Sequence, residues 1–196
     1  MLQALYERRS IRKYQSRPVP REMIEQVIRA GMLAPSAKNR QPWRFVVTQG
    51  AAKQEMLSAM ERGLEQEKRV PLLPNSVSKF QSAVRTMRIM EQAPAVIFVL
   101  EHNGHSLHDS ISAEQRVYER CDMQSIGAYM ENMSLAAASF GLGSLWICDT
   151  RFAHDELSDW LHAEGELVAA MALGYADEHP PARPRDTIEN LVEWRE

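Results

Sequence analysis

The chain has 196 residues, of which 44% are hydrophobic and 25% are charged, and its formal net charge is −3. This average globular composition excludes a disordered chain, and the small net charge gives no general attraction to nucleic acid or to a membrane surface. No apolar run approaches the ~20 residues of a spanning helix, the charged start is unlike a signal peptide, and Cys121 and Cys148 lack CxxC spacing. We expect a single domain, residues 1–196, in the reducing cytoplasm, with neither a nucleic-acid nor a membrane partner.

Helical and strand-like segments alternate along the chain. Helical segments carry apolar residues three and four apart, and strand-like segments are short apolar runs rich in β-branched residues. In chain order we expect a helix at 2–9, a helix from Pro20 to Pro35, a strand at 43–48, a helix at 51–68, a break at 70–76, a helix at 77–91, a strand at 94–100, a polar stretch at 101–112, a helix at 114–140, a strand at 144–149, a helix at 154–162, a strand at 166–176 and a proline-containing tail from 178. Strands separated by helices predict a layered α/β or α+β structure.

The segment 114–140 is the longest helical pattern, and it ends at Gly141. It has small residues on several sides, namely Ala128, Ser134, Ala136, Ala137, Ala138 and Ser139. Neighbours can approach such a helix closely all round, so we expect it at the centre of the molecule. The core of one chain and the middle of a dimer are both compatible with this composition.

The connection 34–43, APSAKNRQPW, is richer in polar groups than a turn requires. It places Ser36, Lys38, Asn39, Arg40 and Gln41 between two prolines and ahead of a tryptophan. A row of hydrogen-bond donors and acceptors in a stiff loop indicates a binding site. The alternative is that Ser36 and Asn39 only turn the loop locally.

Two arginine-rich clusters lie at opposite ends of the chain. ERRSIRKY, at 7–14, contains Arg8, Arg9 and Arg12, and PPARPRD, at 180–186, contains Arg183 and Arg185. A planar guanidinium donates two parallel hydrogen bonds to a phosphate, so the two clusters can converge on one phosphate group. Two solvated surface patches are the alternative.

Four separated motifs resemble those of the flavin-dependent nitroreductase family in order and spacing: RRSIRKY, APSAKNRQPWRFVV, FGLGSLWI and LGYADEHPPARPR. The resemblance covers nearly the whole chain. It implies an α+β, three-layer fold with a central mixed, mostly antiparallel sheet flanked by helices, in an intertwined homodimer. It also implies FMN at the dimer interface, NADH or NADPH as reductant, and a small organic acceptor such as a nitroaromatic or a quinone.

The same resemblance assigns residues of one subunit to FMN. Five arginines and a serine would bind the phosphate, the ribityl chain and the pyrimidine edge of the ring, namely Arg8, Arg9, Ser10, Arg12, Arg183 and Arg185. Of these, Arg12 would lie at the pyrimidine edge, and the other arginines would lie at or near the phosphate. The backbone along one ring face would be that of Leu145, Trp146, Ile147 and Cys148, which would offer an N–H toward flavin N5.

The loop 34–43 would belong to the pocket of the other subunit. The resemblance places Pro35, Ser36 and Asn39 near the ring and the ribityl chain of the partner's FMN, and Gln41 would shape the loop. The loop would then form the partner's wall of a cofactor pocket, which accounts for its polar composition.

The predicted function is that of an FMN-dependent oxidoreductase that uses NAD(P)H. The flavin carries out hydride transfer, so we name neither a catalytic residue nor a metal site. A permanently charged Arg12 would stabilise the negative charge of reduced flavin at its N1–O2 edge. The alternatives are a non-redox flavin-binding protein and a specialised family member, such as a dehalogenase, a flavin-destructase-like enzyme or an azoline dehydrogenase.

Three further features are open to two interpretations. The histidines of HNGHSLH, at 102–108, could be metal ligands, but the neighbouring Gly104 favours a solvated loop. The methionines at 56, 60, 87 and 90 could line an adaptable channel or pack as amphipathic helices. The basic segment 63–92 is expected to be a lid or excursion, and an exposed helix face is the alternative.

Overall fold

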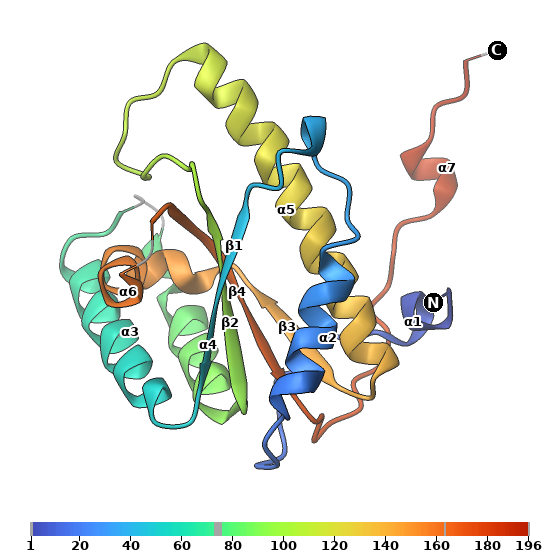
Figure 1. The fold of residues 1–196 in the computed structure, drawn as a ribbon, viewed down its shortest axis with the longest axis horizontal. Helices are drawn as coiled ribbons and strands as arrows, with labels where there is room; N and C mark the ends of the chain where they lie inside the picture. The colour runs from blue at the N-terminus through green and yellow to red at the C-terminus, as the bar shows by residue number, and fades with distance from the viewer. Residues whose placement is uncertain (1, 73–75, 163, 196) are drawn as a thin grey trace.

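The computed structural model describes residues 2–72, 76–162 and 164–195, and it shows a four-stranded sheet between two layers of helices (Figure 1). The elements follow one another as α1 (Leu2–Glu7), α2 (Arg21–Gly31), η1 (Ala37–Asn39), β1 (Trp43–Gln49), α3 (Ala52–Arg69), η2 (Ser76–Lys79), α4 (Phe80–Gln92), β2 (Ala95–Glu101), α5 (Ala113–Ser139), β3 (Gly143–Ile147), η3 (Asp149–Ala153), α6 (His154–Leu161), β4 (Glu166–Gly174) and α7 (Ile188–Leu191). The predicted helices and strands are therefore present, with boundaries shifted by a few residues.

The sheet has the order β1-β2-β4-β3, and each neighbouring pair is antiparallel. This pairing confirms the α+β class and the three-layer fold. The central strand β2 is buried along its whole length because its alternate residues face two helix layers. Phe98 points into one layer, whereas Ile97 and Val99 point into the other.

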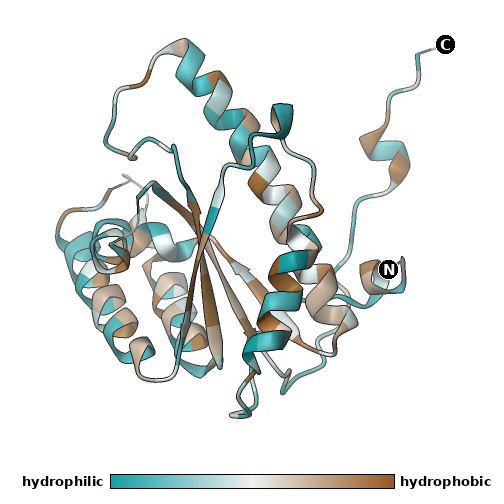
Figure 2. Ribbon diagram, viewed as in Figure 1, coloured by the Kyte–Doolittle hydropathy of each residue, from teal (hydrophilic) through white to brown (hydrophobic). Residues whose placement is uncertain are grey.

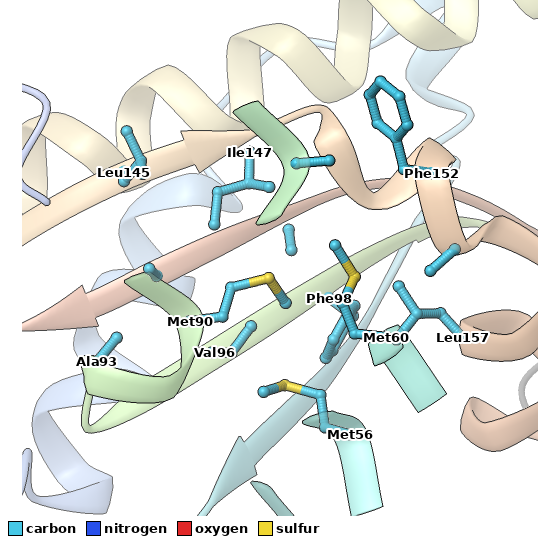
Figure 3. Close-up of a cluster of buried hydrophobic side chains, with 14 of the residues drawn as sticks. Met56, Met60, Met90, Ala93, Val96, Phe98, Leu145, Ile147, Phe152 and Leu157 are labelled. Carbon is cyan, nitrogen blue, oxygen red and sulfur yellow. The ribbon is translucent and has the colours of Figure 1, made fainter. Parts of the chain in front are cut away.

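One face of the sheet is covered by α3, α4 and α6, which lie together on one side in Figure 1. Met56 and Met60 of α3 and Met90 of α4 are fully buried there, and Figure 3 shows them packed with strand residues. Met87 is partly buried against the same cluster. These methionines therefore serve helix packing within the chain, which is the second of the two interpretations.

The other face is covered by α2 and α5 (Figure 1). Tyr129 of α5 is fully buried, and its hydroxyl donates a 2.6 Å hydrogen bond to the Ile28 carbonyl of α2. Its ring lies against Gly31, where an added Cβ would fall 2.0 Å from a ring carbon. A capping box at Ser112 and Gln115 fixes the start of α5. Of the small residues of α5, Ser134 and Ala137 are buried, whereas the alanines at 128, 136 and 138 are only partly buried and Ser139 is exposed. Within one chain, α5 is therefore covered on one side and not all round.

The C-terminal tail leaves this body. Residues 181–195 are exposed, and Figure 1 shows the segment running away from the sheet and the helices. Figure 2 shows apolar positions in α7, where Ile188 is 64% and Leu191 is 69% exposed.

The segment 63–92 contains the end of α3, then η2, then α4. Residues 73–75 of the expected break lie outside the described residues. Ala83 and Met90 of α4 are fully buried, whereas Lys68, Arg69 and Arg85 are exposed. Closure of this segment over a ligand stays a prediction. Among the helices of the described residues, none combines the length and the apolar character that a bilayer crossing requires.

Candidate functional site

The basic segment, Arg8–Lys13, is fixed through its backbone. Ser10 forms a parallel bridge with Ser144 at the start of β3, and the Ile11 N–H donates to the Ser144 carbonyl at 3.0 Å. Ile11 is buried beside Gly143, where an added Cβ would fall 2.7 Å from the isoleucine side chain. The segment thus continues the sheet beyond β3, and glycine at 143 permits the close approach.

The chain that leaves β4 runs beside the same segment. The Asp177 N–H donates to the Lys13 carbonyl at 2.9 Å, and the Glu178 carboxylate accepts hydrogen bonds from the backbone N–H groups of Arg12 and Lys13. The start of the C-terminal tail is therefore held against the N-terminal motif, although the two are about as far apart in sequence as the chain allows.

A cavity of about 390 Å³ lies where these segments meet. It is lined by Arg8 and Arg9, by Gly141, Gly143 and Ser144, and by the tail residues 178–180, among others. Glu7 and Glu178 line the cavity as well, and the Glu178 carboxylate is engaged by backbone N–H groups. The Arg8 and Arg9 guanidinium groups are therefore the candidates on this lining for contact with an anionic group.

The predicted arginines differ in their surroundings. Arg8 is largely shielded and lies 3.4 Å from Glu131 of α5, and Arg9 donates to the Tyr6 and Arg8 carbonyls at 2.6 and 2.8 Å. Arg12 is exposed and donates to the Ser10 carbonyl at 3.1 Å. The structure thus brings Arg8 and Arg9 to the cavity, whereas Ser10 does not line it and pairs with Ser144 of β3. Arg183 and Arg185 lie further along the exposed tail and do not line it.

The outer edge of β3 carries backbone groups that point away from the sheet. Because the Ser144 carbonyl accepts from Ile11 on that side, and because residues two apart in a strand point the same way, the N–H groups of Trp146 and Cys148 also point outward. Leu145 and Ile147 instead pair with β4 and bury their side chains. Trp146 is 40% exposed and approaches Gly127 of α5.

The polar loop, residues 34–43, has a strained backbone. Lys38, Asn39 and Gln41 have φ of 51°, 54° and 48°, and within the described residues only one other non-glycine residue, His162, has a positive φ. Such conformations cost ~1–3 kcal/mol each and persist only where neighbouring groups impose them. The Ser36 hydroxyl accepts from the Gln41 N–H at 3.1 Å, and the Ala37 N–H donates to the Ser125 hydroxyl of α5 at 3.2 Å.

Arg40 provides the charged contact between this loop and α5. Its guanidinium donates to both carboxylate oxygens of Asp122, at 3.1 and 2.7 Å, and lies 4.8 Å from the centre of the Tyr118 ring. The Asp122 side chain is only 1% exposed. Pro35, Asn39 and Gln41 remain exposed beside this anchor, and Ser36 is half-buried.

Within one chain, the polar loop and the basic segment are apart. The loop lies beside Asp122 and Ser125, whereas the basic segment lies beside Glu131 and the cavity at Ala138. Along α5, the nearest of these contacts, Ser125 and Glu131, are roughly 9 Å apart, and the farthest, Asp122 and Ala138, are roughly 24 Å apart. That the loop serves the partner's pocket stays a prediction.

A second cavity, of about 470 Å³, begins at Cys148 and extends between α5, η3 and the ends of β2 and β4. Its apolar wall includes Met123 and Val168, and its polar wall includes Glu101, His154 and Glu166. Burial raises the pKa of the Cys148 thiol, and the neighbouring Asp149 carboxylate adds to this effect. The thiol is therefore held protonated, which disfavours a nucleophilic role.

The carboxylates of this second cavity form a buried network. Glu101, only 4% exposed, lies opposite Glu166 in the β2–β4 register and hydrogen-bonds Asp122. Burial and the Asp122 carboxylate raise the pKa of Glu101 to about 7. His154 contacts Glu166 at 2.7 Å and Asp155 at 2.9 Å. The hydrogen bond to Glu166 raises the pKa of His154 to about 9 despite its burial.

The histidines of the 102–108 segment face different partners. His102 contacts the Pro42 carbonyl at 3.1 Å, and His108 contacts Asp155 at 3.2 Å. Among the described residues, no cluster of three potential ligands has the geometry of a metal site. The loop interpretation therefore accounts for their contacts.

The sequence model described as "Nitroreductase family" matches residues 5–175. The chain belongs to the nitroreductase family. A protein of Archaeoglobus fulgidus provisionally named NADH dehydrogenase/NAD(P)H nitroreductase is 34% identical over 146 residues, which cover 74% of this chain and 66% of that protein. A 5,6-dimethylbenzimidazole synthase of Rhodospirillum rubrum is 28% identical over 196 residues, covering 91% of this chain and 84% of the synthase.

A solved structure supports the same fold. A protein of Desulfovibrio desulfuricans, provisionally named a nitroreductase and solved in complex with FMN, superposes with a TM-score of 0.74 at 26% identity. The superposition covers 99% of this chain and 96% of that protein. The family and the fold that the four motifs predicted are therefore confirmed.

Sequence reasoning about this nitroreductase-family chain did not single out the residues that hold the site in place. Glu178 receives the backbone of the basic segment, and Asp122 receives Arg40. A signal for Asp122 existed, because it falls on the helix stripe that also contains the buried Ser125, Ile126 and Tyr129. A carboxylate on a buried stripe requires a cationic or hydrogen-bonding partner.

Proposed function

We propose that the chain is an FMN-dependent oxidoreductase that uses NADH or NADPH to reduce a small organic acceptor, such as a nitroaromatic or a quinone. The observation that carries this proposal is the position of the basic segment. Its backbone bonds to the edge of β3, so the arginine-lined cavity and the outward N–H groups of Trp146 and Cys148 lie along one strand edge. An anionic group and a flat ring system joined to it can occupy such an edge together.

FMN fits the residues present on this edge. Arg8 and Arg9 line a cavity that suits its phosphate, with Ser10 beside them. Bound FMN would supply hydride transfer between donor and acceptor. The Trp146 and Cys148 N–H groups would hold the reacting nitrogen of the ring in place, and Arg12 would place a permanent positive charge at the pyrimidine edge. Arg183 and Arg185, in the first part of the tail, would close on the phosphate.

The working unit we propose is an intertwined homodimer. The polar loop would then form the far wall of the partner's flavin pocket. Large apolar side chains lie uncovered where a partner would pack: Tyr6 is 80%, Leu33 is 81% and Trp194 is 79% exposed. The C-terminal tail extends away from its own body, as an arm that embraces a second chain would (Figure 1).

The acceptor would bind in the second cavity, which starts at Cys148 and therefore at the ring. Its mixed apolar and polar wall suits a small aromatic molecule with polar substituents. The segment 63–92 contributes Leu72 to this wall, which is compatible with a lid there. We expect the enzyme to work in the cytoplasm.

The visible spectrum of the freshly purified protein tests the proposal. The bound cofactor is released and identified, and the protein is then mixed anaerobically with NADH and, separately, with NADPH. Bleaching of bound FMN by either donor supports the proposal and identifies the donor. A protein that is colourless and stays colourless after incubation with FMN contradicts it, and FMN that binds but is not bleached by either donor favours the non-redox alternative.

A second candidate is a specialised member that consumes its own flavin. The similarity to a 5,6-dimethylbenzimidazole synthase over 91% of this chain supports it. The same sample discriminates the two under air: loss of the flavin spectrum during turnover, with a fragmented product, favours the second candidate. Steady NAD(P)H oxidation with a quinone and an intact flavin spectrum favours the first.

A further inference from the structure

We propose that Asp122 and Glu101 are positioning residues for the polar loop, and that a proton on Glu101 keeps the loop in the shape that binds the cofactor. The proposal rests on the proposed function in one respect, namely that the loop contacts FMN in the partner subunit. Neither residue would touch the flavin. Both would act through Arg40, which joins them to the loop.

The loop needs an external hold because its own backbone resists its shape. Lys38, Asn39 and Gln41 all have positive φ, a backbone conformation that is unfavourable for residues other than glycine. Its neutral contacts include the Ser36 and Ser125 hydroxyls, at 3.1 and 3.2 Å, and the Pro42 carbonyl, which accepts from the His102 N–H at 2.9 Å. The one bidentate ionic contact is that of Arg40 with Asp122, so it has the greatest part in holding the loop.

The carboxylate of Asp122 serves two partners. Both of its oxygens accept from the Arg40 guanidinium, and the carboxyl group of Glu101 hydrogen-bonds the same carboxylate. Two carboxyl groups can share a hydrogen bond only if one of them is protonated, because two buried carboxylates repel each other. With a proton on Glu101, the carboxyl group donates to Asp122 and leaves its geometry toward Arg40 intact. Without that proton, Asp122 and Glu101 separate, and both compete for one guanidinium.

The groups around Glu101 set the pH range in which it loses its proton. Glu119 and Asp122 oppose its ionisation from α5, and Glu166 lies opposite it in the β2–β4 register. Arg40 favours ionisation from the loop, and the positive charge of His154 is engaged by Glu166. His105 lies on the wall of the same cavity. Glu101 also lines that cavity, so it can exchange its proton with solvent.

The consequence is a pH-dependent affinity with a defined sign. The pKa of Glu101 is raised to about 7, so the proton is present in mildly acidic solution and is lost above neutrality. FMN should therefore bind more tightly at pH 6 than at pH 8. The second ionisation of the FMN phosphate, near pH ~6, acts in the opposite direction, since it strengthens binding to arginines as pH rises.

The experiment is a fluorescence titration of the apoprotein with FMN at pH 6 and pH 8, in wild type, Glu101→Gln and Asp122→Asn. Glutamine keeps the hydrogen bond to Asp122 without a proton to lose. From pH 6 to pH 8, we expect the Kd of wild type for FMN to rise by a factor at least about fivefold larger than the factor for Glu101→Gln. A factor of this size is usual for coupling between two sites. Asp122→Asn should bind weakly at both values. Glu61→Gln, an exposed change on α3, is the control and should follow wild type.

A second readout needs no flavin. Hydrogen exchange of the loop amides at 36–41, corrected for the intrinsic effect of pH, should be faster at pH 8 in wild type and unchanged in Glu101→Gln. Equal behaviour of these two proteins in both measurements overturns the proposal, whether or not Asp122→Asn folds. If neither wild type nor any variant binds FMN, both the proposed function and the role of the loop in cofactor binding are wrong. Hydrogen exchange of the loop amides still decides whether Glu101 holds the loop.

Discussion

The basic segment and the polar loop are both polar and both predicted to face FMN, yet they are held in opposite ways. The basic segment is fixed through main-chain hydrogen bonds to Ser144 and Glu178. The polar loop is fixed chiefly through the Ser36 and Arg40 side chains, with a main-chain contribution at Pro42, whose carbonyl accepts from the His102 N–H at 2.9 Å. In the basic segment, main-chain groups make the fixing contacts, so the side chains are available for a ligand. In the polar loop, side chains make the chief fixing contacts, so the loop presents its backbone to a ligand.

The two regions also differ in how completely their charges are neutralised. Arg8 has a single acidic neighbour at 3.4 Å, and Arg12 is exposed, so their positive charge is only partly neutralised. Asp122, Glu101 and Glu166 are closely paired and largely buried. Incompletely neutralised charge indicates binding, whereas buried, closed networks set stability and geometry. Substitutions in each region should therefore change different measured quantities.

The largest expected effect belongs to the closed network. His154→Gln should lower the free energy of unfolding at pH 6 by about 3 kcal/mol, since a raised His pKa stabilises at about 1.4 kcal/mol per unit. The pKa of His154 is about 9 in the fold against 6.5 in a model peptide. Its contribution is thus complete below pH 6.5 and is lost as pH rises through 9.

Denaturant unfolding at pH 6 and pH 10 measures this difference. The gap between wild type and His154→Gln should be smaller at pH 10, while His179→Gln, on an exposed histidine, should match wild type at both values. A gap of equal size at both pH values would mean that His154 contributes packing and not charge. FMN binding at pH 6 should change little if the variant is folded.

The incompletely neutralised charges should show the reverse pattern. Arg8→Ala should weaken FMN binding by roughly 1.5–3 kcal/mol, about 10- to 150-fold in Kd, because a charge-assisted hydrogen bond is lost. Its stability should change little, since the ion pair with Glu131 is half-exposed. Arg185→Ala should weaken binding in the same way if the tail closes on the phosphate.

Titration of the apoproteins with FMN and with riboflavin measures the phosphate contribution separately. Arg8→Ala should affect FMN and leave riboflavin binding nearly unchanged. Arg88→Ala, on the exposed face of α4, is the matched control. Full flavin retention by both Arg8→Ala and Arg185→Ala would show that the phosphate is held elsewhere.

A neutral contact of the loop should have a smaller effect than either charged group. Ser36→Ala removes the acceptor of the Gln41 N–H, which should cost about 1 kcal/mol of stability. It should also loosen the loop and raise the Kd for FMN several-fold. Ser139→Ala, which removes an exposed hydroxyl bonded to Leu135 within α5, is the control for stability. If Ser36→Ala matched this control in FMN affinity, the shape of the loop would not depend on Ser36.

Much of the fold could be predicted from the sequence because its patterns are local. The apolar run at 94–100 became β2, and the helical stripe at 114–140 became α5. The strand predicted at 144–149 ends at Ile147 because η3 begins at Asp149. Periodicity does not report which strands pair, so the sequence left α/β and α+β open until the resemblance, and then the antiparallel register, decided.

The supports of the site could not be predicted in the same way. The Arg40–Asp122 contact joins residues 82 positions apart, and the Arg12–Glu178 contact joins residues 166 apart. Such contacts depend on the topology of the fold, which a short stretch of sequence does not determine. The motifs identified residues that are predicted to face a ligand, because their composition is unusual for a loop, whereas Glu101 was only the first residue of a polar stretch.

The smallest expected effect concerns the strained backbone. Lys38 has φ 51°, which costs a side-chain residue ~1 kcal/mol or more and costs glycine little. Lys38→Gly should therefore stabilise the apoprotein, by less than ~1 kcal/mol because glycine also gains freedom in the unfolded chain. Arg62→Gly, on the exposed face of α3, should destabilise it by ~1 kcal/mol, since there the helical backbone favours a side chain.

Thermal unfolding of the two variants provides the comparison, because only the sign of the change is needed. Stability changes of opposite sign in the two variants would show that the strain lies in the loop. Arg40 and Asp122 would then be the groups that impose it. The same loop, freed by glycine, should lose some FMN affinity, since the bound shape would no longer be maintained in advance. Destabilisation by both variants would mean that the loop favours its shape unaided, and the anchor at Asp122 would then have no strain to oppose.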